Sequence, residues 1–147
     1  MNTPISALLE RKGSVIHAVS PAISVAEAVA EMNRHRVGAI VVLEQGRLVG
    51  MFTERDVLRR VVGDNRDPKR TLVAEVMTAN VIVISPDTTV EETMGIFIAK
   101  RCRHLPVVAA GVLTGVISIG DVTRWMADSH RVEAEHLKNY ITGGFPT

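Results

Sequence analysis

The chain has 147 residues and a formal net charge of +1 at pH 7, and only 3% of it is aromatic, so aliphatic side chains must build the core. A nearly neutral charge gives no general attraction to nucleic acid or to an anionic membrane surface, and no apolar run approaches the roughly 18 residues of a membrane span. The single cysteine, Cys102, excludes an internal disulfide and a cysteine-based zinc cluster. With an N-terminus unlike a signal peptide, these features predict a cytoplasmic protein with no membrane partner, and nucleic-acid binding is not expected.

The sequence repeats itself at a constant offset of 65 residues. Residues 20–59 align without a gap to residues 85–124, with 12 identities in 40 positions, where composition alone gives roughly two or three. An internal repeat sets the architecture. We therefore expect two similar halves that share a core about a pseudo-twofold axis.

Each copy predicts the order strand, helix, strand, strand, helix. Residues 15–19 and 81–84 are short apolar runs that end at Ser-Pro, which is typical of a strand leaving a sheet. Capping boxes begin at Ser24 and Thr89, and apolar residues at helical spacing follow each of them.

A hairpin and a second helix follow in each copy. Tight turns at 45–46 and 110–111 join the predicted strands, which are residues 39–43 with 48–53 and residues 105–109 with 113–118. The second helices are expected from residue 53 to about 62 and from residue 118 to about 127.

The chain divides into four segments along its length. They are a first repeat at 4–62, a polar linker at 63–70, a second repeat at 71–128 and a C-terminal helix and tail at 129–147. Short helices are expected at 4–10 and 71–77, ahead of the two copies. Residues 131–141 are predicted to form a separate helix, with Val132, Leu137, Tyr140 and Ile141 as candidate contacts, that stops at Gly143-Gly144. Such a helix needs the body or a second subunit to pack on.

The most informative short motif is Ser/Thr-x-x-Asp, which runs from Thr53 to Asp56 and from Ser118 to Asp121. Each copy lies where a strand passes into a helix, and amides at a helix N-terminus favour phosphate. The aspartate can accept two hydrogen bonds from the diol of a ribose, and the hydroxyl can bind sugar or phosphate. A nucleotide site is one interpretation; a plain capping box is the other, because the chain has four such boxes.

A second feature makes the two sites unequal. Residues 103–106 read Arg-His-Leu-Pro before an apolar strand, and with Arg55 they could supply positive charge to phosphate oxygens. The matching residues 38 and 39 of the first copy are small and neutral. One site is therefore expected to be cationic, and the other to offer little charge beyond His17.

Signatures of catalysis and of metal binding are missing. No phosphate-binding glycine loop of a known enzyme class and no set of nucleophile, base and orienting group is evident. The histidines lack the spacing of metal ligands. We expect no enzyme activity, no catalytic cofactor and no metal.

The repeat, its strand and helix order, the Ser-Pro opening and the Ser/Thr-x-x-Asp-Val close together resemble the CBS domain. Roughly residues 4–128 resemble a tandem pair of such domains, a Bateman module. The resemblance implies an α+β fold of two β-α-β-β-α repeats related by a pseudo-twofold axis, here with a C-terminal helix. It also implies a non-catalytic regulatory module that binds AMP, ADP, ATP or NAD, and less readily S-adenosylmethionine, in two clefts between the repeats. A homodimer and an unidentified regulated protein are the expected partners.

The resemblance also implies which residues lie in each cleft. The first cleft would contain Thr53, Arg55, Asp56, Asn80, Val81, Arg103, His104 and Pro106, and the second would contain Ile16, His17, Val37, Gly38, Ala39, Ser118 and Asp121. Many family members are fused to an enzyme or transporter, whereas this chain is expected to stand alone. The alternative is a protein-interaction module whose clefts are vestigial.

Overall fold

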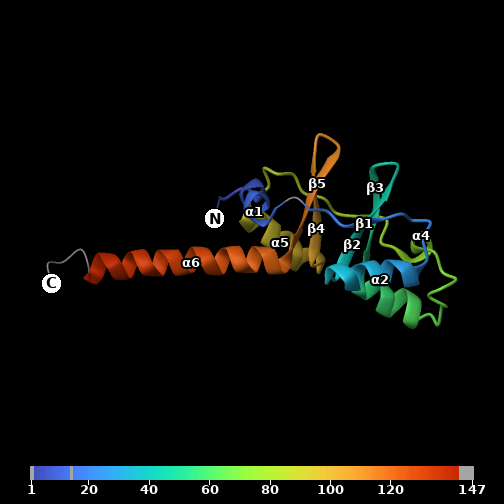
Figure 1. Ribbon diagram of the computed structural model, residues 1–147. Helices are drawn as coiled ribbons and strands as arrows, with labels where there is room; N and C mark the ends of the chain where they lie inside the picture. Colours follow the sequence, from blue (N-terminus) through green and yellow to red (C-terminus); the bar gives the residue numbers. More distant parts are fainter. Residues whose placement is uncertain (1, 14, 143–147) are drawn as a thin grey trace.

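The computed structural model describes residues 2–13 and 15–142, and for residues 131–142 it describes the helical backbone but not the side chains. Its elements are α1 (Ile5–Lys12), β1 (Ala18–Val19), α2 (Val25–His35), β2 (Ala39–Glu44), β3 (Arg47–Thr53), α3 (Glu54–Asp56), η1 (Val57–Val62), α4 (Val73–Val76), α5 (Val90–Lys100), β4 (His104–Ala109), β5 (Val112–Ser118) and α6 (Ile119–Thr142). Two similar halves stand side by side, and α6 extends away from them (Figure 1). The α+β fold of two repeats with a C-terminal helix is confirmed.

Both predicted hairpins are present. Strand β2 pairs antiparallel with β3 in a three-stranded sheet of order β1-β2-β3, and β4 pairs antiparallel with β5 in a separate sheet. The turn residues Gln45 and Gly46 have φ of 51° and 78°, and Ala110 and Gly111 have φ of 50° and 79°. Two consecutive residues with positive φ are typical of the type I′ turn that matches the twist of a hairpin.

The predicted first strand of each copy is shorter than expected. In the first repeat only β1 remains, paired in parallel with β2. In the second repeat the expected strand at 81–84 is reduced to a single bridge between Ile84 and Val107. The reason is Pro106, which occupies the place of Val41 in the other sheet and has no N–H to donate to a neighbouring strand.

The first helix of each repeat begins and ends in the same way. The hydroxyls of Ser24 and Thr89 accept hydrogen bonds of 3.1 Å from the amides three residues later, which confirms the hydroxyl half of each predicted capping box. The Glu92 carboxylate accepts from the Thr89 hydroxyl at 3.1 Å. Both helices end at an arginine with positive φ, Arg36 at 56° and Arg101 at 53°. These two residues differ by the repeat offset of 65.

The second helix differs between the copies. In the first repeat, α3 continues as the π-helix η1, where the Gly63 amide donates to the Leu58 carbonyl at 2.8 Å. A Cβ on Gly63 would lie 2.6 Å from the carbonyl oxygen of Arg59, so glycine permits this tight end. Asp128 takes the equivalent place in the second repeat, and there α6 continues as a regular helix.

The predicted break before residue 131 is therefore wrong, since a single helix, α6, extends from Ile119 to Thr142. Figure 1 shows its first turns against α1 and α5 and the rest projecting from the body. The contacts expected of Val132, Leu137, Tyr140 and Ile141, and the stop at Gly143-Gly144, lie outside the described residues.

The two short helices exchange places between the repeats. Helix α1 packs on the second repeat, where Ile5 and Leu8 join the core formed around Phe97. Helix α4 packs on the first repeat, where Val73 and Val76 join the core formed by β2, β3 and α2. The Ile5 amide donates to the Thr88 carbonyl at 2.8 Å, and the Val73 amide donates to the Ile23 carbonyl at 2.9 Å.

A third apolar cluster joins the two halves. Its buried members Ala39, Val41 and Met51 come from the first sheet, and Leu113 and Val116 of β5 pack against them. The sheets thus face each other across a shared seam, as the sequence predicts for halves too small to stand alone. Among the described helices, none combines the length and the low polarity that crossing a membrane requires.

Candidate nucleotide-binding clefts

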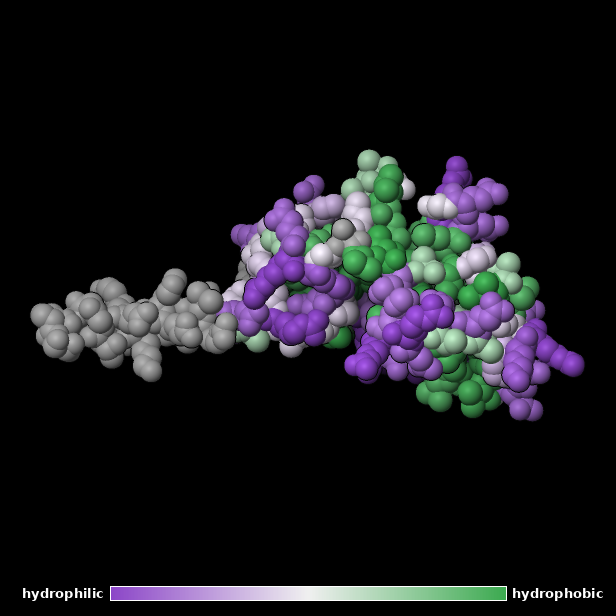
Figure 2. All heavy atoms as spheres, in the orientation of Figure 1, coloured by the Kyte–Doolittle hydropathy of each residue, from purple (hydrophilic) through white to green (hydrophobic). Residues whose placement is uncertain are grey.

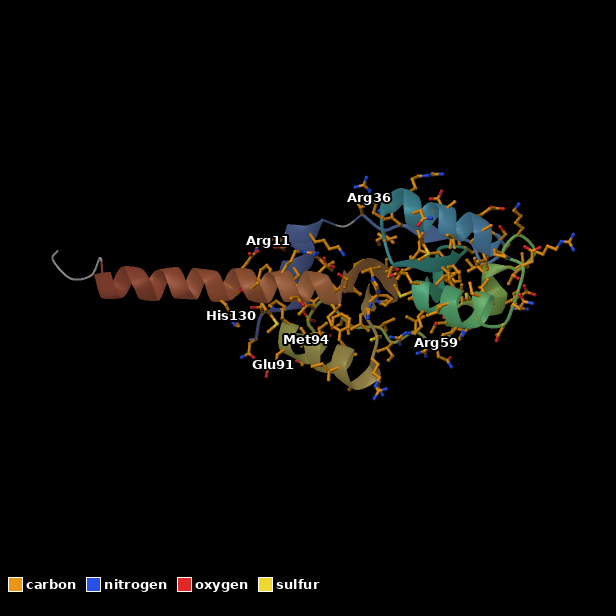
Figure 3. All side chains as sticks on the ribbon, turned by 90° about the horizontal axis from the view of Figure 1, so that it is seen from below. Arg11, Arg36, Arg59, Glu91, Met94 and His130 are labelled. Atoms are coloured by element: carbon orange, nitrogen blue, oxygen red, sulfur yellow. The ribbon has the colours of Figure 1, made fainter. Side chains whose placement is uncertain are left out.

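Two cavities open along the seam, and we name them cleft 1 and cleft 2. Cleft 1 has a volume of about 550 Å³ and is lined by the end of β3, the start of β4, α3 and η1, and by residues 78, 80–82 and 100–103. Cleft 2 has a volume of about 410 Å³ and is lined by the end of α1, residues 15–17, residues 36–39 and the end of β5. In the view of Figure 3, Arg59 of cleft 1 and Arg36 of cleft 2 lie at opposite edges of the molecule.

The structure brings together nearly all of the residues that the sequence groups into sites. Cleft 1 is lined by Thr53, Arg55, Asp56, Asn80, Val81, Arg103 and His104. Cleft 2 is lined by Ile16, His17, Val37, Gly38, Ala39, Ser118 and Asp121. Pro106 is the exception: it is buried in β4, lines neither cavity, and its carbonyl accepts a hydrogen bond of 3.0 Å from the Ile84 amide. Leu105 and Val107, on either side of it in β4, belong to the core of the second repeat. Alternation along the strand therefore points Pro106 to the other face of the sheet, and its assignment to cleft 1 stays a prediction.

Asp56 is held at the floor of cleft 1 by uncharged donors. Its carboxylate accepts from the Thr53 amide at 3.1 Å and from the Thr78 hydroxyl at 3.1 and 3.3 Å. The Thr53 hydroxyl accepts from the Asp56 amide at 3.2 Å, which completes a capping box. The nearest cation, Arg60 Nε, lies 3.8 Å from Oδ1. The side chain is only 6% exposed.

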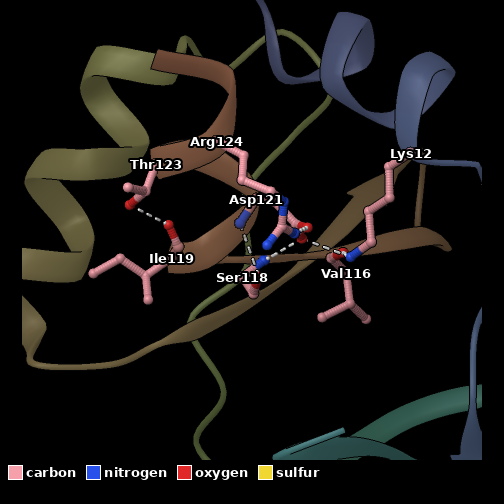
Figure 4. A network of polar contacts seen from close by, with 7 residues as sticks. All are labelled: Lys12, Val116, Ser118, Ile119, Asp121, Thr123 and Arg124. Carbon is pink, nitrogen blue, oxygen red and sulfur yellow. Dashed lines mark hydrogen bonds and ion pairs between the residues drawn. The ribbon is translucent and has the colours of Figure 1, made fainter. Parts of the chain in front are cut away.

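Asp121 has the same place in cleft 2 but different partners. Its carboxylate accepts from the Ser118 amide at 2.8 Å, from Lys12 Nζ at 2.6 Å and from Arg124 at 2.6 Å. Burial alone would raise the pKa of this carboxyl, but the bonds from Lys12 and Ser118 outweigh it and hold the pKa below its usual value. Figure 4 shows this network.

The capping alternative is therefore correct for both aspartates, and it does not exclude a ligand role. Both carboxylates cap a helix, and both also line a cavity. A carboxylate has about four acceptor positions, so a cap does not use all of them.

Cleft 1 carries the positive charge that the sequence predicts. Arg59, Lys100 and Arg103 line it, and Arg55 donates from its guanidinium to the Arg101 carbonyl at 3.0 Å. This bond joins the two repeats across the cavity. A guanidinium has five N–H groups, so Arg55 keeps donors for another acceptor.

Cleft 2 is more cationic than the sequence indicates. Lys12, Arg36 and Arg124 line it, beside His17. The expectation of little charge is wrong because it considered only the positions matching the first cleft. The Lys12 ammonium comes from a helix 109 residues away from Asp121 along the chain, and no spacing rule connects the two. Arg124 is three residues after Asp121, a pairing distance on any helix, so that partner could have been found.

The wall between the clefts contains groups common to both. Gly38, Met51 and His104 line the two cavities. Burial lowers the pKa of the His104 imidazole, and the nearby positive charge of Lys12 lowers it further, against the opposing effect of Glu54. A neutral imidazole at this point can both donate and accept a hydrogen bond.

His17 and His35 contact each other and a carboxylate. Their rings stack with centroids 3.7 Å apart, and His35 Nε2 lies 3.3 Å from a carboxylate oxygen of Glu31.

The remaining candidates for reactive or metal-binding groups have no such role. Burial raises the pKa of the Cys102 thiol at the wall of cleft 1, which favours the unreactive protonated form. Within the described part of the chain, no three or more His, Cys, Asp or Glu residues are grouped so as to hold a metal ion.

The family comparison agrees with this geometry. The model of the CBS domain matches residues 12–63 and again residues 73–128. The chain belongs to the CBS-domain family. CBS domains are modules of a regulatory kind, and the match indicates no family of enzymes.

Relatives and solved structures support the same assignment. The chain is 40% identical over 127 residues to the CBS domain-containing protein CBSX3, mitochondrial, of Arabidopsis thaliana, and the match covers 83% of this chain and 62% of the plant protein's length. It is 38% identical to the CBS-domain containing protein ATU1752 from Agrobacterium tumefaciens, with a TM-score of 0.81 over 84% of this chain and 99% of that one.

The CBS domain pair of protein MJ0100 has the same fold, with a TM-score of 0.77 at 21% identity over 88% of this chain and 99% of that one. Its crystal structure is a complex with 5′-methylthioadenosine and S-adenosyl-L-methionine.

Proposed function

We propose that this CBS domain pair is a non-catalytic sensor that binds an adenosine-containing ligand between its repeats and signals its presence to a partner protein. The proposed ligands are AMP, ADP, ATP or NAD, and S-adenosylmethionine is a less favoured candidate. The observation that carries the proposal is the Asp56 carboxylate at the floor of a 550 Å³ cavity, with acceptor positions left over from its capping role.

The acceptor count supports a ribose at Asp56. Two donors reach its carboxylate, the Thr53 amide and the Thr78 hydroxyl, so about two of its four acceptor positions remain. A ribose presents two adjacent hydroxyls, and each can donate one hydrogen bond. A buried carboxylate that receives both bonds gains more than one in water, because charge-assisted bonds are strong at low dielectric.

The remaining surface of cleft 1 suits the other parts of a nucleotide. Val81, Ile82 and Leu105 provide apolar surface for an adenine ring, and Arg59, Lys100 and Arg103 provide cations for phosphate. The MJ0100 complex adds a separate support, because both of its ligands contain adenosine.

The direct test is calorimetry on the full chain with AMP, ADP, ATP, NAD and S-adenosylmethionine. At least one of them should bind well below millimolar concentration, and millimolar or absent binding of all five would contradict the proposal. The ribose assignment is tested on the ligand rather than on the protein, because removal of Asp56 also removes a helix cap. The 2′-deoxy and 3′-deoxy forms of the best ligand should each bind at least about tenfold more weakly, since one charge-assisted hydrogen bond is lost.

We also propose that the chain forms a homodimer through the exposed faces of η1 and α5, which we name the helical side. Leu58 and Val62 of η1 are each 65% exposed, and Ile98 of α5 is 70% exposed. Figure 2 shows a hydrophobic patch at the lower edge of the first repeat. Sedimentation velocity should detect a dimer, and Leu58→Glu or Ile98→Glu should weaken it. The equally exposed Val112 lies on the β4–β5 hairpin, so Val112→Glu is the control that should leave a helical-side dimer intact.

The alternative function is assembly alone, with clefts that bind nothing. The exposed apolar helix residues favour it, and the two ideas differ in their effect on stability. A ligand present at 100 times its dissociation constant stabilises the fold by about 2.7 kcal/mol, whereas a vestigial cleft leaves the unfolding temperature unchanged. A cytoplasmic location and the identity of the regulated partner stay predictions.

A further inference from the structure

The two capping aspartates of the repeats have unequal electrostatic partners. Each is reached by one donor from the short segment that packs onto its repeat. For Asp56 this donor is the neutral hydroxyl of Thr78, two residues after α4. For Asp121 it is the ammonium of Lys12, the last residue of α1.

Lys12 is fixed at two points inside cleft 2. Its Nζ donates to Asp121 Oδ2 at 2.6 Å and to the Val116 carbonyl at 2.7 Å (Figure 4). Arg124 takes Oδ1 of the same carboxylate at 2.6 Å, and the Ser118 amide takes Oδ2 at 2.8 Å. Three donors therefore use about three of the four acceptor positions. A ribose diol needs two, so cleft 2 cannot receive one while Lys12 stays in place.

Displacing Lys12 has a cost that depends on the ligand. The Lys12 side chain is 38% exposed, but its carboxylate partner is only 10% exposed, so the ammonium gives up a charge-assisted bond to a largely desolvated anion. This loss is unfavourable unless another anion replaces Asp121 beside the ammonium. An uncharged nucleoside supplies no new anion. A nucleoside phosphate does, and the flexible four-carbon stem lets the ammonium move to it.

We propose that Lys12 makes cleft 2 selective for phosphorylated nucleotides over unphosphorylated nucleosides, by occupying the ribose acceptor until a phosphate replaces Asp121 as its counter-ion. This inference rests on the proposed function and specifies the ligand class of its second site. Cleft 1 lacks this device, because Thr78 carries no charge and can share the Asp56 carboxylate with a diol. Arg36 and Arg124 line the same cavity. Their guanidinium groups can bind further phosphate oxygens beside the displaced Lys12 ammonium.

The test uses isoleucine methyl signals as separate reporters of the two clefts in the full chain. Ile16 lines cleft 2, and Ile82 lines cleft 1. Adenosine and AMP are titrated into the wild-type protein, Lys12→Met, which keeps the length of the stem without its charge, and Lys12→Arg, which keeps the charge. Lys69→Met is the matched control, since it removes an exposed lysine of the linker that lines neither cleft.

At Ile16 the wild type should bind AMP more tightly than adenosine. In Lys12→Met the affinity for adenosine should rise and the preference for AMP should fall by about tenfold, while Lys12→Arg and Lys69→Met keep the wild-type preference. If Lys12→Met does not fold, Lys12→Gln carries the same expectation.

If the uncharged variants keep the wild-type preference for AMP at Ile16 while ligands still shift Ile82, the proposed role of Lys12 is wrong and the proposed function stands. Absence of any ligand shift at both reporters in every protein would instead overturn the proposed function.

Discussion

In each repeat a capping aspartate lies both at the start of a helix and in the lining of a cavity. Asp56 and Asp121 close the first turn of a helix, and both do so at the floor of a cavity. A capping residue contributes about 1 kcal/mol to stability, so loss of either aspartate mixes a folding effect with any loss of binding. Experiments that change the ligand separate these two effects, and experiments that remove the carboxylate do not.

His104 provides a titration that reports the charge between the clefts. Its pKa is lowered in the folded state by burial and by Lys12, so on acidification the unfolded chain takes up this proton first. Stability therefore rises with pH wherever the unfolded chain holds more protons. The His104 contribution is fully present above the unfolded value near 6.5 and is lost as the pH falls below it.

We predict that His104→Gln flattens the dependence of folding stability on pH between pH 7 and pH 5. Urea unfolding at a series of pH values measures the slope in each protein. His130→Gln, at an exposed position on α6, is the control substitution because it leaves the wall between the clefts unchanged. A His104→Gln slope equal to that of the wild type would show that the imidazole is not shielded from water as the cavity wall implies.

At the scale of residues, local spacing predicts the clefts only in part. The hydroxyl and the carboxylate of each Ser/Thr-x-x-Asp motif are neighbours on one turn, so the sequence identifies them directly. Lys12 reaches Asp121 across 109 residues, and Thr78 reaches Asp56 across 22. Such partners depend on how α1 and α4 pack, and the repeat offset of 65 gives no information about them.

At the scale of elements, one strand position shows how closely the short segments approach the sheets. Gly50 and Gly115 are equivalent residues of β3 and β5. A Cβ on Gly50 would lie 2.7 Å from the Met77 sulfur and 2.9 Å from the Thr78 carbonyl oxygen, and a Cβ on Gly115 would lie 2.6 Å from a Leu9 methyl carbon. Both glycines therefore allow a packed segment to touch the strand.

We predict that Gly50→Ala destabilises the fold more than Gly115→Ala does. The obstacle at Gly50 includes a backbone oxygen that is fixed by a hydrogen bond of 2.9 Å from the Met51 amide, whereas Leu9 can change its rotamer. Overpacking of a fixed site costs about 1–3 kcal/mol. Chemical unfolding of both variants gives the two values.

Gly95→Ala is the control for this comparison. Gly95 lies inside α5 with nothing within 4 Å of its Cβ position, so alanine should be neutral or should stabilise the helix by up to about 1 kcal/mol. Equal losses at Gly50 and Gly115 would mean that the backbone of residues 77–78 yields as easily as a leucine side chain.

The elements themselves were predictable where a local signal decides them. The turn residues at 45–46 and 110–111 specify both hairpins, and Ser24 and Thr89 specify where two helices begin. The strand at 81–84 could not be predicted correctly, because its pairing fails at Pro106, which is distant in sequence. The π-helix η1 and the unbroken α6 could not be predicted, because Gly63 and Asp128 are one pair among the many positions at which the two copies differ.

At the scale of the whole molecule, the exchange of short helices makes each repeat depend on a segment that lies ahead of the other in sequence. Ile5 of α1 is fully buried in the core of the second repeat, and Val73 of α4 is fully buried in the core of the first. The chain order therefore differs from the order of the packed units. The exchanged helices α1 and α4 therefore hold the two halves together, in addition to the apolar contacts of the seam.

We predict that small core substitutions in these helices loosen the repeat on which the helix packs. Ile5→Val removes one buried methylene and costs about 0.5–1.5 kcal/mol; hydrogen exchange should quicken in α5 and β5 and stay unchanged in α2. Val73→Ala should do the reverse, quickening exchange in α2 and β2. Locally packed units open with their own free energies, so exchange resolves them separately.

Faster exchange in α2 on substitution of Ile5 would instead place α1 with the first repeat. Equal quickening everywhere in both variants would mean that the seam joins the repeats into a single cooperative unit, because no part could then open without the rest.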